Sequence, residues 1–184
     1  MKTLFVDMLS PRGHVRLNQF YLSHLFESDS VLAIGESLSN SYKEYSQISL
    51  GSTPLRPTFL ERIFLFLRVL WVIWRQKPSQ IVFFSYDLLT FPLVARWCSS
   101  SDIKIYCFEH DTAPSFFLRN IFQKFSGSSV LHLAYTPYIQ KLFTKLSLNA
   151  IYIPHPCVGL NQSSDDDAEW EQILGTHRKY FQSI

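Results

Sequence analysis

The sequence predicts an α/β fold with a doubly wound, mostly parallel sheet of six or seven strands. Short apolar runs alternate with helix-like patterns along most of the chain, which is typical of βαβ units. The 184 residues, 47% of them hydrophobic, are enough for one core of ordinary size but short for two full domains. The chain has no run of about 18 uncharged apolar residues, so we expect no membrane-spanning helix.

The first part of the chain shows three strand-like runs and one helical pattern. An apolar strand precedes the turn SPRGH, and the polar stretch 36–57 contains a weaker strand signal in SYKEYSQISL. The expected elements are a strand at 3–9, a helix at about 16–27, a strand at 31–35 and a short strand within 41–50.

The helix expected at 59–77 is apolar nearly all the way round. Its polar residues form a narrow stripe that recurs every seven residues, at Glu61, Arg68 and Arg75. A helix that docks on a sheet needs an apolar arc of only about 100°. Two explanations stay open: the helix is buried on several sides, or it lies in a membrane interface with Trp71 and Trp74 at headgroup depth.

The second part of the chain continues the alternation. The expected elements are strands at 80–85, 102–108, 130–136 and 149–154, and helices at 87–97, 114–125 and 137–146. We expect one domain over 1–155. Residues 156–184 read as an acidic linker and a short helix, leading toward a further domain.

Charge and cysteine content narrow the classes of partner. Residues 1–153 hold fifteen Lys/Arg against ten Asp/Glu, whereas residues 154–184 hold two against five. A mildly basic body suits phosphate-bearing molecules or an anionic membrane. The basic residues are scattered, so no nucleic-acid partner is expected. The three cysteines are far apart and predict neither disulfides nor a CxxC metal site, which favours a reducing, cytoplasmic location.

Three loops at the predicted carboxyl ends of strands carry candidate site residues. In SPRGH, Gly13 and His14 stand at a helix start that can hold an anion, or form a plain turn. After the strand at 80–85, Tyr86 precedes Asp87, which either belongs to a site or caps the next helix.

The third loop, CFEHDTAP, places Glu109, His110 and Asp111 together. An imidazole beside a carboxylate can bind sugar hydroxyls, orient a phosphate or move a proton. The alternatives are that Asp111 or Thr112 caps the next helix and that Glu109 pairs with a basic side chain. His132, inside an apolar strand, reads as a core histidine. We expect no metal site, because the loop histidines have no close-spaced pair.

The order of these motifs resembles the N-terminal domain of GT-B glycosyltransferases, most closely the retaining family 4. The likeness covers about residues 1–158 and rests on the order of short motifs: SPRGH, KPSQIVFFS, IKIYCFEHD, VLHLAYT and AIYIPHP. It implies a Rossmann-like acceptor-side domain. Two departures are Ser79, where the family has aspartate, and His155-Pro156, where it has Asn-Gly.

The resemblance also implies roles for individual residues. His110 matches the family's histidine near the donor sugar and Asp111 accompanies it, so these two are the expected catalytic pair. Gly13 matches the glycine of the family's first loop. Gly13 and His14 are expected to line the acceptor side of the site. Thr136 stands where the family often has a small hydroxyl residue after a strand. The other expected substrate-binding residues are Tyr86, Glu109 and His155.

The leading hypothesis is the acceptor-side domain of a glycosyltransferase. It would pass a sugar from a nucleotide-sugar donor to a polysaccharide or lipid-linked glycan, with no cofactor, and would be inactive without a separate donor-binding half. A lipid-linked acceptor would place it at the inner face of the membrane as a peripheral protein. The alternatives are a non-catalytic scaffold subunit that docks a partner through residues 59–77, and a stand-alone α/β enzyme acting on a phosphorylated small molecule.

Overall fold

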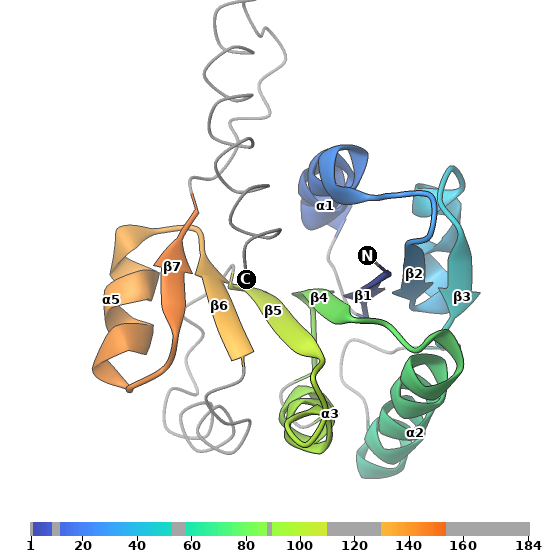
Figure 1. The fold of residues 1–184 in the computed structure, drawn as a ribbon. Coiled ribbons are helices and arrows are strands. Elements are labelled where there is room, and N and C mark those ends of the chain that lie inside the picture. The colour runs from blue at the N-terminus through green and yellow to red at the C-terminus, as the bar shows by residue number, and fades with distance from the viewer. Residues whose placement is uncertain (1, 9–11, 53–57, 88–89, 110–129, 154–184) are drawn as a thin grey trace, which may run out of the picture.

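A computed structural model shows a single seven-stranded, all-parallel sheet, which confirms the predicted fold class (Figure 1). The structure describes residues 2–8, 12–52, 58–87, 90–109 and 130–153. The strand order is β3-β2-β1-β4-β5-β6-β7. Along the chain the strands are β1 Thr3–Asp7, β2 Val31–Ile34, β3 Gln47–Ser49, β4 Gln80–Ser85, β5 Lys104–Glu109, β6 Val130–Ala134 and β7 Ala150–Tyr152.

Helices cover both faces of the sheet. The helices are α1 Arg12–Leu25, the 3₁₀ helix η1 Glu36–Tyr42, α2 Phe59–Gln76, α3 Thr90–Cys98 and α5 Pro137–Lys145. Figure 1 shows α1 on one face, with α2 and α3 on the other. On the same face as α2 and α3, Phe143 of α5 packs against His132, with ring centroids 4.7 Å apart.

Most expected elements are present, with shifted ends. The largest shift is at α1, which begins at Arg12 rather than near 16, so Gly13 and His14 lie in its first turn instead of in a loop. The helix expected at 114–125 and the segment 156–184 lie outside the described residues.

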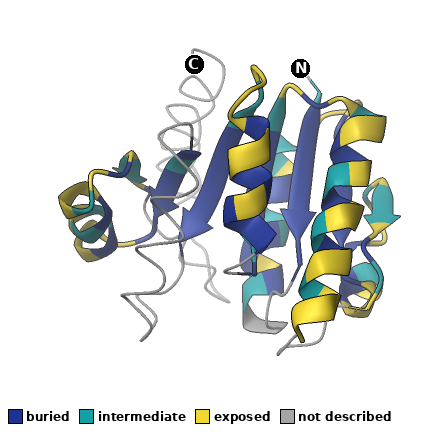
Figure 2. Cartoon of the chain, turned by 90° about the horizontal axis from the view of Figure 1, so that it is seen from below, coloured by how far each residue is buried: buried dark blue, intermediate teal, exposed yellow. Residues whose placement is uncertain are grey.

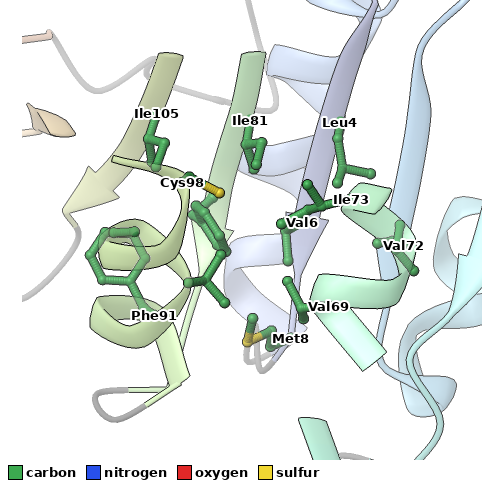
Figure 3. Close-up of a cluster of buried hydrophobic side chains, with 14 of the residues drawn as sticks. Leu4, Val6, Met8, Val69, Val72, Ile73, Ile81, Phe91, Cys98 and Ile105 are labelled. Carbon is green, nitrogen blue, oxygen red and sulfur yellow. The ribbon is translucent and has the colours of Figure 1, made fainter. Parts of the chain in front are cut away.

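The strands form the buried layer of the molecule, because each face of the sheet packs against helices. Alternate residues of one strand therefore enter two separate cores: Leu4 and Val6 pack toward α2 and α3, whereas Phe5 packs toward α1. Figure 3 shows the first of these cores, in which Val69 and Val72 of α2 face the sheet. This explains why the strands read as continuous apolar runs.

Helix α2 buries one side only. Its buried residues follow helical spacing: Leu65, Val69, Val72 and Ile73. The opposite side holds large apolar residues that are 48% to 69% exposed: Phe59, Leu60, Phe64, Leu67, Trp71 and Trp74. The first of the two explanations, burial of this helix on several sides, is therefore wrong. None of the helices in the described part of the chain is both long and apolar enough to cross a bilayer.

Local interactions fix both ends of α2. Thr58 and Glu61 form a capping box, in which each side chain accepts a hydrogen bond from the other residue's backbone N–H, at 3.4 and 2.6 Å. At the other end, Lys77 adopts a left-handed conformation with φ of 48°, and its N–H donates to the carbonyl of Ile73. The capping box at Thr58 and the left-handed residue Lys77 therefore define where α2 begins and ends.

The turn between β3 and α2 predicts a stability effect at Gly51. This glycine has φ of +78°, a conformation that costs a residue with a Cβ about 1–2 kcal/mol. A Cβ there would also lie 1.9 Å from Nη1 of Arg68, which donates to the carbonyl of Leu50. We expect Gly51→Ala to lower the free energy of unfolding by about 1–2 kcal/mol in urea titration.

The neighbouring exposed residue gives the control for this prediction. Ser52→Ala removes an exposed hydroxyl one position away and should change the unfolding free energy by less than about 0.5 kcal/mol. Equal stability of Gly51→Ala and the unchanged protein would contradict the backbone strain proposed for this turn.

Candidate functional site

The strand order puts a topological switch point at the carboxyl ends of β1 and β4, the place where a sheet of this kind carries its ligand crevice. The chain leaves β1 for one face of the sheet and β4 for the other, and such switch points are where open α/β sheets bind ligands. The register shifts by one residue here, from Val6 opposite Phe83 to Asp7 opposite Ser85. The shift brings polar residues of the two strands together, and Ser85 Oγ donates to Asp7 Oδ1 at 2.6 Å.

Asp7 is fully buried and stands at the centre of a polar cluster. Its Oδ2 accepts hydrogen bonds from Asn18 Nδ2 of α1 at 3.0 Å and from the Tyr42 hydroxyl at 2.7 Å. Because a buried carboxylate needs such donors, one side chain ties β1 to β4, α1 and η1. Asp7 was not among the site residues expected from the sequence. The available signal was an acidic residue at the end of an otherwise apolar strand.

The cluster also fixes the state of Tyr42. Burial and then the neighbouring Asp7 carboxylate raise the pKa of the Tyr42 phenol well above its ordinary value. A phenol is already protonated at neutral pH, and the raised pKa keeps Tyr42 a hydrogen-bond donor in alkaline solution as well.

A second buried cluster forms at the ends of β5 and β6. His132 Nδ1 lies 2.8 Å from Glu109 Oε1, and the Tyr86 hydroxyl donates to the Glu109 carboxylate at 3.0–3.2 Å. Glu109 thus pairs with the basic side chain of His132, which was one of the alternatives that the sequence left open for Glu109. His132 is a buried core histidine, as expected. The structure brings Tyr86 and Glu109 together, but their substrate-binding role stays a prediction.

The second cluster includes donor atoms suited to a metal ion. Ligand atoms of Cys107, Glu109 and His132 all lie within 4.8 Å of one another, and all three residues are buried. A thiolate, a carboxylate and an imidazole are ligands that Zn²⁺ accepts. The hydrogen bonds from His132 and Tyr86 occupy the Glu109 carboxylate, whereas His132 Nε2 is buried without a hydrogen-bond partner.

The remaining expected site residues divide into two groups. Thr136 caps α5, with its hydroxyl accepting from the N–H of Ile139 at 3.1 Å. Asp87 accepts from the N–H of Thr90 at 3.0 Å, which confirms its expected capping role, and lies 3.4 Å from Arg62. The other group, His110, Asp111 and His155, lies outside the described residues.

A groove of about 630 Å³ runs between α1 and the segment of η1. Its lining combines two cations, one carboxylate, amides and aromatic rings, and includes Arg16, Gln19, Phe20, Asn40, Lys43, Glu44 and Tyr45. Tyr42 also lines it, so the groove borders the Asp7 cluster. Hydrogen-bonding groups beside aromatic faces suit a polar ligand with both hydroxyls and C–H surface.

Comparison with known proteins supports the fold at low identity. No protein-family model matches the sequence, and no curated protein does. HepE of Anabaena in complex with UDP is similar over 95% of this chain, with a TM-score of 0.61 and 14% identity. The lipopolysaccharide outer core galactosyltransferase WaaB in its apo form is similar over 88%, with a TM-score of 0.60 and 13% identity.

A third solved structure extends the comparison to another activity. The UDP-N-acetylglucosamine 2-epimerase of Rickettsia bellii is similar over 100% of this chain, with a TM-score of 0.61 and 10% identity. The chain spans about half of each structure: 50% of HepE, 47% of WaaB and 49% of the epimerase. The chain therefore has the Rossmann-like α/β fold found within GT-B proteins.

The Asp7 cluster predicts the effect of removing one hydroxyl. Tyr42→Phe leaves the ring in place but removes a donor to a buried carboxylate, so we expect the free energy of unfolding to fall by about 1–3 kcal/mol. Chemical denaturation followed by circular dichroism measures this change. Tyr45→Phe, on the same segment but only half-buried, should change it by less than about 0.5 kcal/mol. Equal losses in the two variants would contradict the role given to the Asp7 contact.

Proposed function

We propose that the chain is the acceptor-side half of a glycosyltransferase that uses a nucleotide-sugar donor. The observation that carries this proposal is the fold shared with three proteins that are named for UDP or UDP-sugars or for galactosyl transfer. HepE has been solved with UDP-glucose as well as with UDP. The switch point at Asp7 and Ser85 lies at the edge of the sheet where folds of this kind bind their ligands.

The proposed division of labour puts sugar positioning on this half. His110 and Asp111 would lie beside the transferred sugar, as the resemblance to family 4 implies. Gly13 and His14, in the first turn of α1, would line the acceptor side, where helix N–H groups favour an anion. The facing donor-binding half would supply most of the stabilisation of the leaving diphosphate. No cofactor takes part in this scheme.

The other expected residues would complete the edge. Tyr86 and Glu109 would shape the crevice from β4 and β5, because their mutual hydrogen bond fixes both side chains. Thr136 and His155 would border the donor-binding half from the β6 and β7 side. Asp7 would act as a positioning residue, since it joins the start of the crevice to α1 through Asn18.

The groove between α1 and η1 is the proposed binding site for the glycan part of the acceptor. Amide and hydroxyl groups can bind sugar hydroxyls, while rings such as Phe20 pack against the C–H face of a sugar. Arg16 and Lys43 would favour an acidic sugar or a phosphate-linked glycan. We propose a polysaccharide or lipid-linked glycan acceptor, met at the cytoplasmic face of a membrane.

A non-catalytic scaffold subunit is the second candidate function. The exposed apolar side of α2 favours it, because a large apolar surface on a folded domain marks a binding site. The two candidates differ in one measurable respect. A scaffold would support no sugar transfer when a donor-binding half is supplied.

The catalytic proposal predicts a loss of transfer at His110. With a donor-binding half supplied, His110→Ala should lower kcat for sugar transfer by on the order of 100-fold, because a positioned acid–base or polar group is lost. Radiolabelled sugar transfer measures the rate, and thermal unfolding checks the fold. His24→Ala, on α1 at the other end of the helix from His14, is the matched control and should keep full activity.

Two outcomes would contradict this proposal. Unchanged transfer by His110→Ala would contradict the catalytic role of His110 and favour the alternative in which CFEHDTAP is only a loop cap. Full transfer by the isolated chain would contradict the assignment of the chain as half of an enzyme.

The acceptor groove predicts an effect on acceptor binding alone. Arg16→Ala with Asn40→Ala removes two exposed groove residues, so KM for a soluble acceptor glycan should rise about tenfold, the value of roughly one lost hydrogen bond to a charged group. KM for the donor should not change. Lys141→Ala, exposed on α5, is the control. An equal rise in both KM values would contradict a groove specific for the acceptor.

A further inference from the structure

Helix α2 presents a continuous apolar stripe to solvent. Its exposed members follow spacings of four and three residues along one side of the helix: Leu60, Phe64, Leu67, Trp71 and Trp74. The stripe runs from Leu60 to Trp74, about 21 Å along the helix axis. Isolated exposed apolar residues are common, but a stripe of this length along one helix indicates a binding surface.

Helix α3 widens the stripe into a surface. The two helices pack together, with Thr90 Oγ1 of α3 donating to the carbonyl of Arg62 at 3.4 Å. Leu93 and Trp97 of α3 are 38% and 48% exposed. Figure 2 looks onto this side of the sheet, where exposed residues of both helices face the viewer. We call these exposed residues of α2 and α3 the α2–α3 face.

The charges of the α2–α3 face are almost all positive. Within the two helices and the C-cap of α2, the exposed basic residues are Arg68, Arg75, Lys77 and Arg96, whereas Arg62 is half-buried and forms an ion pair with Asp87. The single acidic residue of these helices is Glu61, whose carboxylate accepts two hydrogen bonds from Thr58 in the capping box. The face therefore combines apolar surface with net positive charge.

Tryptophan and basic residues gather at the same end of this face. Trp71, Trp74 and Trp97 are three of the four tryptophans in the chain, and all lie in the C-terminal halves of their helices. Arg75 lies over the Trp71 ring, 5.2 Å from its centroid, and Arg96 precedes Trp97. Tryptophan rings flanked by cations are suited to the headgroup region of a bilayer.

We propose that the α2–α3 face docks on an anionic lipid surface. The apolar stripe would enter the boundary between headgroups and acyl chains, which an interfacial helix reaches to a depth of about 5–10 Å. The cations would contact anionic headgroups. The excess of positive charge favours a lipid partner of negative charge over a second copy of the same face, since two such faces would repel.

Docking on this face sets the orientation of the candidate site. Because α2 connects parallel strands, it runs antiparallel to them, and its Phe59 end lies at the carboxyl edge of the sheet. A membrane along α2 would therefore lie beside the switch point at Asp7 and Ser85. The link between membrane docking and a lipid-linked acceptor rests on the proposed function. Lipid binding by the α2–α3 face does not depend on catalysis.

Vesicle binding tests the proposal without any sugar nucleotide. The unaltered chain should sediment with vesicles that contain phosphatidylglycerol and bind weakly to phosphatidylcholine alone, with a blue shift of tryptophan emission. Trp71→Ala with Trp74→Ala should lower the partition coefficient at least tenfold, because two large exposed apolar groups are lost. Arg75→Gln with Arg96→Gln should lower partitioning into anionic vesicles about 30-fold and leave neutral vesicles unaffected.

Matched controls lie elsewhere on the described surface. Tyr138→Ala removes an aromatic residue that is 67% exposed on α5, and Arg16→Gln removes an exposed cation on the other face of the sheet. Both controls should keep the unaltered partition coefficient. All variants should keep the circular dichroism spectrum, because the substituted side chains are exposed.

Three results would overturn the lipid proposal. One is no sedimentation of the unaltered chain with anionic vesicles; another is equal loss in the Tyr138→Ala control. The third is a concentration-dependent dimer, seen by analytical ultracentrifugation, that the paired Trp substitution abolishes without changing vesicle binding; that result would assign the face to a second copy. Lipid binding without sugar transfer would overturn only the proposed function.

Discussion

The buried carboxylate of Asp7 is the constraint on which the arrangement of the carboxyl edge depends. It accepts hydrogen bonds from side chains of β4, α1 and the end of η1 at 2.6–3.0 Å, so three elements from distant parts of the sequence meet at one residue. The one-residue register shift beside Asp7 makes the contact with Ser85 possible. Both the switch point of the sheet and the groove beside α1 border this cluster.

The two faces of the sheet serve different purposes. On one face, α1 and η1 enclose the Asp7 cluster and border the groove, which places polar recognition there. On the other face, α2 buries one side on the sheet and exposes an equally apolar side. An exposed apolar side on a helix lowers the solubility of a domain. The exposed side of α2 is therefore best explained as a binding surface.

The sequence was sufficient for the fold and insufficient for the site. Unbroken apolar runs such as QIVFFS predict buried parallel strands because both faces of the sheet are covered. The contacts of Asp7 with Tyr42 and of Glu109 with His132 join residues 35 and 23 positions apart, and no local pattern encodes such pairs. The capping role of Asp87 was predictable, since it depends on residues three positions apart.

The central claim is that ligands of this fold bind at the carboxyl edge around Asp7. Hydrogen exchange of the chain joined to a donor-binding half, measured with and without UDP-sugar and acceptor glycan, tests it most directly. The expected result is ligand-dependent protection in α1, η1 and the ends of β4 and β5, with no change in α2 in the absence of lipid. Protection confined to α2 and α3, or none at the edge, would contradict a site there.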